Sequence, residues 1–442
     1  MEISSESKSK SGMPIRYLLV SWLMVLSAVA FLDRTNISIA GVQIGKEFGI
    51  DNAHLGWVFS AFLIGYALFQ IPGGFLARRF GPRYVLAISV IWWGVFTAFT
   101  ALVPPSVRGA LWLMILIRFA LGAGEASMYP AASQFVERWF PLAERGKANG
   151  IIFGGVGLGS GLTPPLLTAV ILHYGWRNSF WLCALIGVAA GGVWYLAARD
   201  TPEGHFLVRP KELEGIVAGR EHLSTQDTGA DNGNERAENI AWRSWFSKEI
   251  LALTFSYFCY GYVAWIFFSW FYIYLAEVRG LNLKASALYS MLPFIAMTIG
   301  SLLGGLVSDW LTRHYSARAG RCYMPALAIG CTAVLLLMGS RATSNEVAAI
   351  VLACGAGALY LSASCYWSVA ADFAGKHAGI VAGAMNMGGQ VGGAVTASLT
   401  PLIALHFGWQ VAFVTATAFA ILGSLTWLIV DPGARLSKIP TS

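Results

Sequence analysis

Four charged residues lie inside stretches of the chain that are otherwise apolar, and they are the residues best able to do chemistry. Asp33 and Arg34 are neighbours in AFLDRTNIS, while Arg118 and Glu125 lie in IRFALGAGEA. A charge inside a membrane costs several kcal/mol, so it persists mainly where it faces a polar cavity or a partner. The spacing of Arg118 and Glu125 places both side chains on one helix face, about 10 Å apart along its axis.

Two cations and two carboxyl groups are suited to binding an anion together with a proton. A guanidinium group matches a carboxylate with two parallel hydrogen bonds, which predicts that Arg34 holds the anion. Of the two acids, Glu125 is predicted to be the main proton carrier, because Asp33 has Arg34 beside it. Arg118 is predicted to belong to the same charge network. The alternative is that all four residues form internal salt bridges that only hold helices together.

Neutral polar side chains in other apolar stretches could complete a binding site. Tyr66 is followed by Gln70, and Asn386 by Gln390, at a spacing that puts each pair on one helix face. Ser364 lies in a further apolar stretch. Hydroxyl and amide groups that face two arginines would suit a polyhydroxylated acid. The alternative is that these groups form hydrogen bonds between helices.

The composition excludes an ordinary soluble protein. Of the 442 residues, 56% are hydrophobic and 12% are charged, whereas roughly a quarter are charged in a soluble domain. Such a chain cannot cover itself with charge, and it does not need to if lipid surrounds it. The six cysteines have no CxxC spacing and are interpreted as packing residues. No ligand spacing joins the histidines, so we expect no metal and no cofactor.

Twelve apolar runs are long enough to cross a bilayer, which takes about 20 residues. They predict transmembrane helices near 17–43, 54–76, 84–103, 109–136, 147–173, 179–198, 249–275, 285–310, 322–340, 345–371, 378–404 and 408–430. The polar stretch in the middle is interpreted as a flexible connector with a short surface helix. We therefore expect an all-α integral membrane protein with these parts: a tail over 1–16, a six-helix bundle over 17–198, a linker over 199–247, a second six-helix bundle over 248–430, and a tail over 431–442.

The basic residues predict how the chain is oriented in the membrane. Most of the 30 lysines and arginines lie in the two termini and in the loops on the same side. The loops of the opposite side hold Lys46, Arg108, Arg177, Arg279, Lys284 and Arg341. Because cytoplasmic segments are enriched in Lys and Arg, we predict that both termini are cytoplasmic in the inner (plasma) membrane. Topology then explains the net charge of +7, and no nucleic-acid partner is expected.

A motif recurs in the two halves of the chain. GGFLARRFGPR (Gly73–Arg83) follows the second apolar run, and GGLVSDWLTRHYSARAGR (Gly304–Arg321) follows the eighth. Each combines a glycine pair, an apolar turn and a short basic loop. Repeated halves are typical of carriers that rock two bundles around a central site.

These residues resemble the major facilitator superfamily and, within it, the anion:cation symporter family. The resemblance covers nearly the whole chain outside the tails and the linker. It is carried by FLDRTNISIA (31–40), GGFLARRFGPR (73–83), RFALGAGEASMYPAASQFVERWFPLAERGKANG (118–150) and AGIVAGAMNMGGQVGG (378–393). It implies twelve transmembrane helices in two pseudo-symmetric halves. Similar bacterial carriers move galactonate, glucarate, hexuronates, tartrate or phthalate with protons.

The resemblance also implies roles for single residues. Arg34 matches the family arginine that grips the substrate carboxylate, and Asp33 and Glu125 match acids implicated in proton coupling. Arg118 matches the arginine that tunes or pairs with them. Tyr66 matches a position that lines the sugar-acid site, as does Asn386.

Some positions concern gating or depart from the family pattern. Arg83, Asp309 and Arg313 are expected to belong to the gating loops. Phe31 stands where sugar-acid carriers often have tyrosine, which removes one hydroxyl group. Arg78 stands where the first loop normally has an aspartate, whereas Asp309 keeps that acid in the second half.

We therefore expect a monomeric secondary active transporter, not an enzyme, that carries a small organic anion with protons by alternating access. The expected substrate is a sugar acid, namely an aldonate, aldarate or uronate. The predicted substrate-binding residues are Arg34, Tyr66, Ser364, Asn386 and Gln390. One alternative is a carrier or exchanger of the same fold for phosphate, a dicarboxylate or an aromatic acid. A more remote one is an integral membrane enzyme, although the sequence shows no nucleophile or metal motif near a membrane face.

Overall fold

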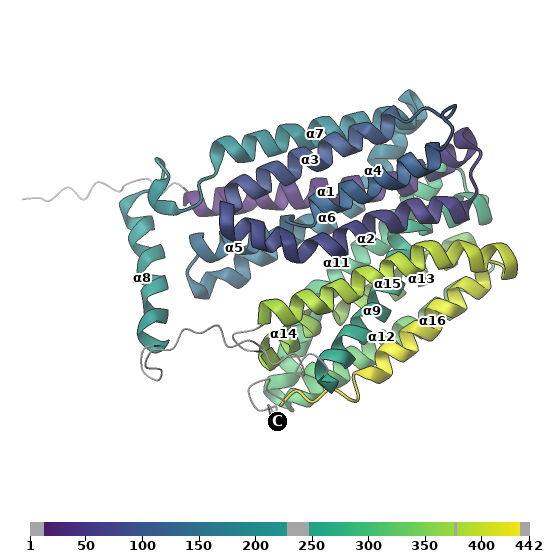
Figure 1. Cartoon of the computed structure of the whole chain (residues 1–442). Helices are drawn as coiled ribbons and strands as arrows, with labels where there is room; N and C mark the ends of the chain where they lie inside the picture. Colours follow the sequence, from purple (N-terminus) through teal and green to yellow (C-terminus); the bar gives the residue numbers. More distant parts are fainter. Residues whose placement is uncertain (1–12, 228–246, 375–377, 434–442) are drawn as a thin grey trace, which may run out of the picture.

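The computed structural model describes residues 13–227, 247–374 and 378–433. The predicted tails over 1–16 and 431–442 lie mostly outside these residues. So does the part of the predicted linker from 228 to 246. The described residues form helices joined by short turns (Figure 1).

The first half of the chain forms a bundle of long helices. They are α1 (Ile15–Phe48), α2 (Asn52–Phe80), α3 (Pro82–Leu102), α4 (Ala110–Glu125), α5 (Met128–Trp139), α6 (Leu142–Tyr174) and α7 (Trp176–Ala197). The connector contains a short 3-10 turn, η1 (Pro202–Gly204), and the surface helix α8 (Pro210–Asp227). The carboxylate of Glu212 in α8 accepts the N–H groups of Ile15 and Arg16, both at 3.1 Å, and so caps the start of α1.

The second half repeats this arrangement. Its elements are α9 (Lys248–Ser269), α10 (Phe271–Ile273), the π-helical turn η3 (Tyr274–Val278), α11 (Leu283–His314), the π-helical turn η4 (Ala319–Tyr323), α12 (Met324–Arg341), α13 (Asn345–Leu361), α14 (Ala363–Ala374), α15 (Ala378–Phe407) and α16 (Trp409–Thr426). Figure 1 shows the two bundles side by side, with the purple to teal helices in one and the green to yellow helices in the other.

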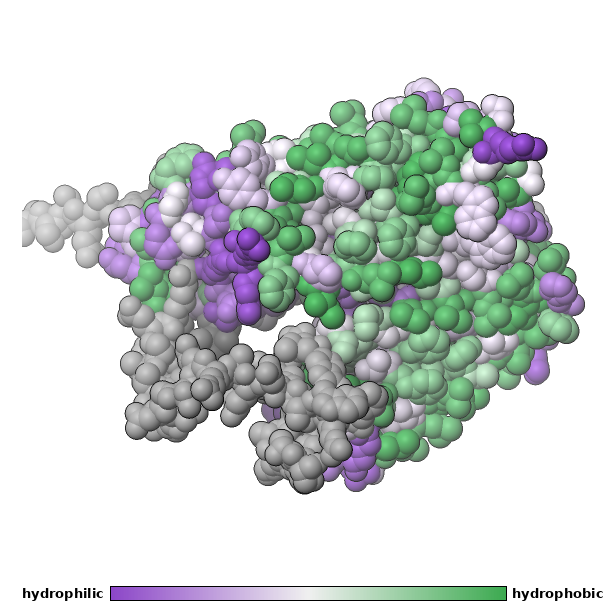
Figure 2. All heavy atoms as spheres, viewed as in Figure 1, coloured by the Kyte–Doolittle hydropathy of each residue, from purple (hydrophilic) through white to green (hydrophobic). Residues whose placement is uncertain are grey.

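The described helices confirm the predicted membrane architecture. Eleven segments of the described chain are long and apolar enough to cross a membrane, with α4 and α5 counted together and α13 and α14 counted together. The helix α15, which is 30 residues long, is the twelfth long helix segment. Its mean hydropathy is lower because it contains several glycines together with Asn386 and Gln390. Figure 2 shows hydrophobic residues over the middle of the surface and hydrophilic residues gathered toward the ends, as a lipid belt requires.

Some of the predicted spans are broken rather than continuous. The span predicted at 109–136 consists of α4 and α5, with Ala126 and Ser127 between them. Pro130 gives a physical reason, because proline has no N–H to donate to the carbonyl group of Ala126. The tenth predicted span is broken at Ser362, between α13 and α14. The fourth and tenth spans occupy equivalent places in the two halves, so the break is part of the repeat.

A turn of nearly identical shape supports the pseudo-symmetry of the halves. LHYGW (172–176) joins α6 to α7, and LHFGW (405–409) joins α15 to α16. Gly175 has φ 84° and ψ 161°, and Gly408 has φ 86° and ψ 159°. Glycine is required in both turns, because a side chain is strained at positive φ. The prediction of two halves did not use this second repeat, although the sequence contains it.

Glycine also allows α2 and α4 to cross at close range. A Cβ atom added at Gly122 of α4 would overlap the backbone of Phe62, and one added at Gly65 of α2 would overlap the backbone of Phe119. Small residues at helix crossings let the backbones approach each other in a membrane protein. This crossing brings the side chains of Phe62 and Tyr66 on α2 toward the charged face of α4.

The two halves are joined near one end, which we call the far end because it lies opposite the end where α1 begins and α16 ends. There Asn52 Nδ2 donates to Glu277 Oε2 at 2.9 Å. Nearer the middle, the hydroxyl group of Ser60 on α2 donates to the carbonyl oxygen of Ala394 on α15 at 2.6 Å. Figure 1 shows the bundles close together at the far end and farther apart at the other, which we call the termini end.

Candidate functional site

The centre of the site is a buried ion pair between α1 and α4. Arg34 Nε lies 2.5 Å from Glu125 Oε1, and the side chains are 3% and 0% exposed. Glu125 is the last residue of α4, directly before the break in the fourth span. The two residues lie 91 positions apart in the chain. The sequence identified both, and the structure shows that they are partners.

Aromatic rings surround the guanidinium group of Arg34. Its central carbon lies 4.6 Å from the ring centroid of Phe31, 4.6 Å from that of Tyr66 and 5.5 Å from that of Phe62. A guanidinium plane is attracted to aromatic faces, and more strongly where water is excluded. These rings hold Arg34 in place and leave the edge of its guanidinium group for polar partners.

The ion pair leaves hydrogen-bonding capacity unused. Among the described residues, Nη2 of Arg34, Oε2 of Glu125 and Nε of Arg118 are buried atoms without a hydrogen-bond partner. A buried polar group without a partner is costly, and a cluster of such groups calls for a physical explanation, such as a bound ion or water molecule. Two unpaired donors from arginines favour an anion as that missing partner.

Arg118 lies beside the pair and shares a small cavity with Arg34. Its guanidinium carbon is 5.1 Å from the ring centroid of Phe62. The cavity has a volume of about 10 Å³ and is lined by both arginines together with Trp265, Phe268 and Ser269, roughly the room one water molecule needs. Because these last residues lie near the end of α9, the arginines lie where the two halves meet.

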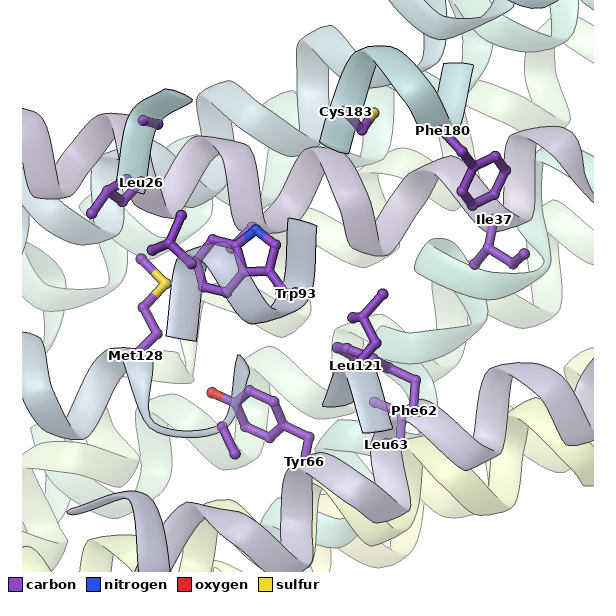
Figure 3. Close-up of a cluster of buried hydrophobic side chains, with 14 of the residues drawn as sticks. Leu26, Ile37, Phe62, Leu63, Tyr66, Trp93, Leu121, Met128, Phe180 and Cys183 are labelled. Carbon is purple, nitrogen blue, oxygen red and sulfur yellow. The ribbon is translucent and has the colours of Figure 1, made fainter. Parts of the chain in front are cut away.

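Asp33 lies on a different side of α1 from Arg34. Neighbouring residues on a helix point about 100° apart, and Asp33 faces Thr97 of α3 and Cys183 of α7. Figure 3 shows Cys183 and Tyr66 on opposite sides of α1, which separates the surroundings of the two neighbours. Among the described residues, neither carboxylate oxygen of Asp33 has a partner at hydrogen-bonding distance. The structure therefore places Asp33 inside the first bundle.

The polar residues predicted in the second half lie on α14 and α15. Oγ of Ser364 and Oε1 of Gln390 are buried and have no partner among the described residues, while Asn386 is half-buried. Within the described chain no hydrogen bond joins these three residues to Arg34. Tyr360 of α13, which the sequence-based prediction did not include, is close enough to Arg34 for an electrostatic interaction.

The predicted gating residues lie at the termini end and make local contacts. Asp309 Oδ1 pairs with Arg321 Nη2 at 3.1 Å, while Arg313 donates from Nε to the backbone oxygen of Asp309 at 3.2 Å. Arg83 donates from Nη2 to the backbone oxygen of Tyr195 at 2.8 Å. The structure thus adds Arg321 to this set, and the sequence signal for it was its place in the basic loop after Asp309.

An aspartate also occupies this region of the first half. Asp200 Oδ1 accepts the backbone N–H of Arg83 at 2.9 Å, so an acid that follows the end of α7 lies at the loop in which Arg78 replaces the usual aspartate. The sequence motif alone did not identify Asp200, because this residue lies far along the chain from the motif. The carboxylate that binds this loop therefore comes from Asp200 and not from the motif position that Arg78 occupies.

Comparisons with known proteins agree with this architecture. The model of the Major Facilitator Superfamily matches residues 23–397. The "Probable sulfoacetate transporter" of Cupriavidus necator is 32% identical and covers 96% of this chain and 95% of its own. The "Probable galactarate/D-glucarate transporter" of Escherichia coli (strain K12) is 27% identical, covering 94% and 93%. A solved bacterial homolog of the human lysosomal transporter Spinster, in an inward-facing and unoccupied conformation, has a TM-score of 0.74 at 17% identity, covering 95% of this chain and 97% of its own.

The match to the family model spans nearly all of the first half and most of the second, and it includes the four buried charges. The similar solved structure covers nearly all of both chains. The chain therefore belongs to the Major Facilitator Superfamily.

Proposed function

We propose that the chain is a proton-coupled symporter that carries a small organic anion, with a sugar acid (an aldonate, aldarate or uronate) as its substrate. The two relatives described above are both named for the transport of organic anions. We place it in the inner (plasma) membrane, and the distribution of Lys and Arg supports an orientation with both termini cytoplasmic. In this proposal the transporter works as a monomer. Transport involves no enzymatic step.

The observation that carries this proposal is the Arg34–Glu125 pair with its unpaired atoms. An anion that docks on Arg34 has to compete with the carboxylate of Glu125. If Glu125 takes up a proton, its hold on Arg34 weakens and the guanidinium group becomes free for the substrate. Proton binding and anion binding then favour each other, which is the coupling free energy that a symporter needs.

The other predicted residues have supporting roles in this proposal. Arg118 lines the same cavity as Arg34 and adds positive charge toward the anion. Tyr66 holds Arg34 through its ring and offers a hydroxyl group. Ser364, Asn386 and Gln390 of the second half would bind the hydroxyl groups of the sugar acid once the halves close around it, and two of them have buried atoms that lack a partner among the described residues.

Alternating access would rock the two bundles against each other. The contacts between the halves, Asn52–Glu277 at the far end and Ser60–Ala394 nearer the middle, support a state that is closed on that side. With cytoplasmic termini, this is a state closed to the outside. The loops with Arg83, Asp309 and Arg313 would close the cytoplasmic side in the opposite state, and Arg321 would act with Asp309.

The test is uptake by the purified protein in liposomes. A panel of D-glucarate, galactarate, sulfoacetate and phosphate is offered with and without an inward proton gradient. For the anion that is taken up, we expect Arg34→Ala to weaken binding by more than tenfold, because truncating one partner of a buried charge pair costs about 2–5 kcal/mol. We expect Glu125→Gln to abolish uptake driven by the gradient and to retain exchange of preloaded anion.

A second arginine–glutamate pair in the same chain provides a matched control. Arg16 Nε lies 3.2 Å from Glu144 Oε2, near the start of α1 and α6. The variants Arg16→Ala and Glu144→Gln should keep both gradient-driven uptake and exchange. Equal binding of the anion by Arg34→Ala and wild type would refute the substrate site, and gradient-driven uptake by Glu125→Gln would refute its role in coupling.

A second candidate function has a specific observation in its favour. Two of the three rings around Arg34, those of Phe31 and Phe62, carry no hydroxyl group, and Phe31 stands where sugar-acid carriers often have a tyrosine. Such a site suits a compact anion with few hydroxyl groups, for example a small sulfonate, a dicarboxylate or phosphate. The relative at 32% identity is named for sulfoacetate. Phe31→Tyr should then improve binding of D-glucarate relative to sulfoacetate, since a new hydroxyl–hydroxyl hydrogen bond contributes about 1 kcal/mol.

A further inference from the structure

A line of buried polar groups runs from Asp33 toward the far end, on the face of α1 that packs against α7. Asn36 donates from Nδ2 to Sγ of Cys183 at 3.5 Å, and Ser179 donates from Oγ to Oδ1 of Asn36 at 2.8 Å. Asn36, Ser179 and Cys183 are each 0% exposed. On α1 Asn36 lies one turn beyond Asp33, and on α7 Ser179 lies one turn before Cys183. The groups therefore form a continuous polar file between the two helices.

Two hydrogen bonds of this file are directed toward Asp33. Ser179 donates toward Asn36, and Asn36 donates toward Cys183, whose thiol faces the carboxyl group of Asp33. The file ends at two carboxylate oxygens that have no hydrogen-bond partner among the described residues. An unpaired carboxylate in a bilayer carries a high cost. A proton, or a water molecule that delivers one, would relieve that cost at the place where the file ends.

The groups that face Asp33 come from each neighbouring helix. Glu125 and Arg118 of α4 interact with it through their charges, Cys183 approaches from α7, and Thr97 approaches from α3. Arg34 points elsewhere, to Glu125 and the rings of Phe31 and Tyr66. Asp33 thus connects the polar file on one side with the charge network of the anion site on the other.

Beyond the other end of the file, on the far side of Trp176, lies a carboxylate that water can contact. The hydroxyl group of Ser179 also lies 2.7 Å from the backbone oxygen of Trp176, whose indole N–H donates to Oε2 of Glu47 at 2.6 Å. The side chain of Glu47 is 35% exposed. Glu47 lies on the same face of α1 as Asp33, about 20 Å farther along the helix axis. The file therefore ends at the backbone of Trp176, whose indole ring separates it from Glu47 at the surface of the far end.

We propose that Asp33 exchanges its proton with the far side of the membrane along the face between α1 and α7, separately from the path of the anion. Water molecules enter beside Glu47 and are bound by Ser179, Asn36 and Cys183. A hydronium ion then transfers a proton to a carboxylate oxygen of Asp33, so one O–H bond breaks, another forms, and a water molecule remains. This inference rests on the proposed function of a proton-coupled symporter.

Separate paths have a physical advantage for coupling. A substrate anion bound at Arg34 would block a proton path that shared its cavity. A path on the opposite side of α1 stays available whether or not the anion is bound, and it reaches the charge network through Asp33. The alternative is that the file consists of hydrogen bonds that hold α1 against α7, as polar residues do between many membrane helices.

The experiment compares gradient-driven uptake with counterflow in liposomes, as a function of the pH on the far side. The probe is D-glucarate, or sulfoacetate if the wild type does not take up D-glucarate. Asn36→Leu removes both hydrogen bonds at similar volume, and Ser179→Ala breaks the file at its next member. We expect each to slow driven uptake at least tenfold and to shift its pH profile toward lower pH. Counterflow, in which labelled and unlabelled anion exchange at equal pH, should stay within twofold of the wild type.

Two further comparisons separate a proton path from a structural role. Cys183→Ala should impair driven uptake, and Cys183→Ser should restore it, because a hydroxyl group can bind the same water. Thr35→Val is the matched control: Thr35 is buried next to Asn36, but its hydroxyl group bonds to the carbonyl oxygen of Phe31 in its own helix. This variant should leave uptake, counterflow and the pH profile unchanged.

The outcomes distinguish this inference from the proposed function. If Asp33→Asn and Glu125→Gln both keep driven uptake, the proton-coupled function itself is wrong. If those two variants lose driven uptake but Asn36→Leu and Ser179→Ala keep the wild-type pH profile, the path is wrong and the function stands. A parallel loss of driven uptake and counterflow in the file variants, with a lowered Tm, would show that the file is structural.

Discussion

At the scale of single residues, the ion pair of Arg34 and Glu125 is the most unusual feature, because it is buried and part of its hydrogen-bonding capacity is unused. Each partner has one atom without a hydrogen bond in the described chain. Taking two charges out of water carries a desolvation penalty that their mutual attraction offsets only with good geometry and further hydrogen bonds. Such a pair, with atoms left unpaired, is the basis of the proposal that Arg34 binds the anion.

This pair gives a prediction about stability. Arg34→Met leaves the carboxylate of Glu125 buried without a partner, so we expect it to reduce the free energy of unfolding by about 3–5 kcal/mol. Adding Glu125→Gln removes that uncompensated charge and should raise the Tm again, although transport should stay lost. The measurement is a thermal-shift series of both single variants and the double variant in detergent. A double variant less stable than Arg34→Met would contradict this account.

Among the helices, the crossing of α2 and α4 determines whether the site forms. Gly122 lies against the backbone of Phe62, and Phe62 and Tyr66 present their rings to Arg34 and Arg118. The break between α4 and α5 follows directly after Glu125. The position of the Glu125 carboxylate thus depends on the close contact between α2 and α4 and on where α4 ends. Neither feature is formed by a charged residue.

A single methyl group at this crossing should therefore disturb the site. We expect Gly122→Ala to push α2 away from α4, to lower the Tm and to weaken anion binding by at least tenfold, because overpacking costs typically about 1–3 kcal/mol. Gly154→Ala is the control, since a Cβ atom at Gly154 in α6 meets nothing within 4 Å. It should be neutral or slightly stabilising, as alanine favours a helix over glycine. Equal Tm and equal binding for the two variants would argue against the crossing.

For the molecule as a whole, the contacts between the halves at the far end stabilise the arrangement described here. Asn52 and Glu277 bridge the halves at the rim of an open depression of about 500 Å³, which also contains Lys46 and Trp409. A hydrogen bond to a charged group contributes about 1.5–3 kcal/mol. A substitution that removes this bond would shift the equilibrium between the two states by about that amount.

Asn52→Asp should shift the protein toward the state that is open at the far end. It places a second carboxylate beside Glu277, so an attraction becomes a repulsion, and we expect the population of that state to rise about tenfold or more. Spin labels at Arg108→Cys and Arg341→Cys, on opposite halves at this end, would measure the change in distance. The surface cysteines Cys331 and Cys354 are first replaced by serine. Asn52→Gln keeps the amide and should leave the distances near those of the wild type.

The membrane architecture, the repeat of two halves and the four buried charges could all be predicted from the order of the residues. These features follow from local properties, since each span must satisfy its own backbone hydrogen bonds and be apolar over its own length. The division into tails, bundles and linker at the predicted boundaries stays a prediction, as do the roles of the site residues. The sequence contains a residue that can break the fourth span, Pro130. Only the structure shows that the break begins directly after Glu125.

Which charges meet depends on the packing of the helices in three dimensions. The fold pairs Arg34 with Glu125 across 91 positions, turns Asp33 away into the first bundle and gives Asp309 the partner Arg321. These outcomes depend on how each helix is rotated about its axis and how close it lies to its neighbour. Contacts such as that of Gly122 with the backbone of Phe62 fix both quantities. Because such contacts join distant parts of the chain, the pattern within any one span does not contain them.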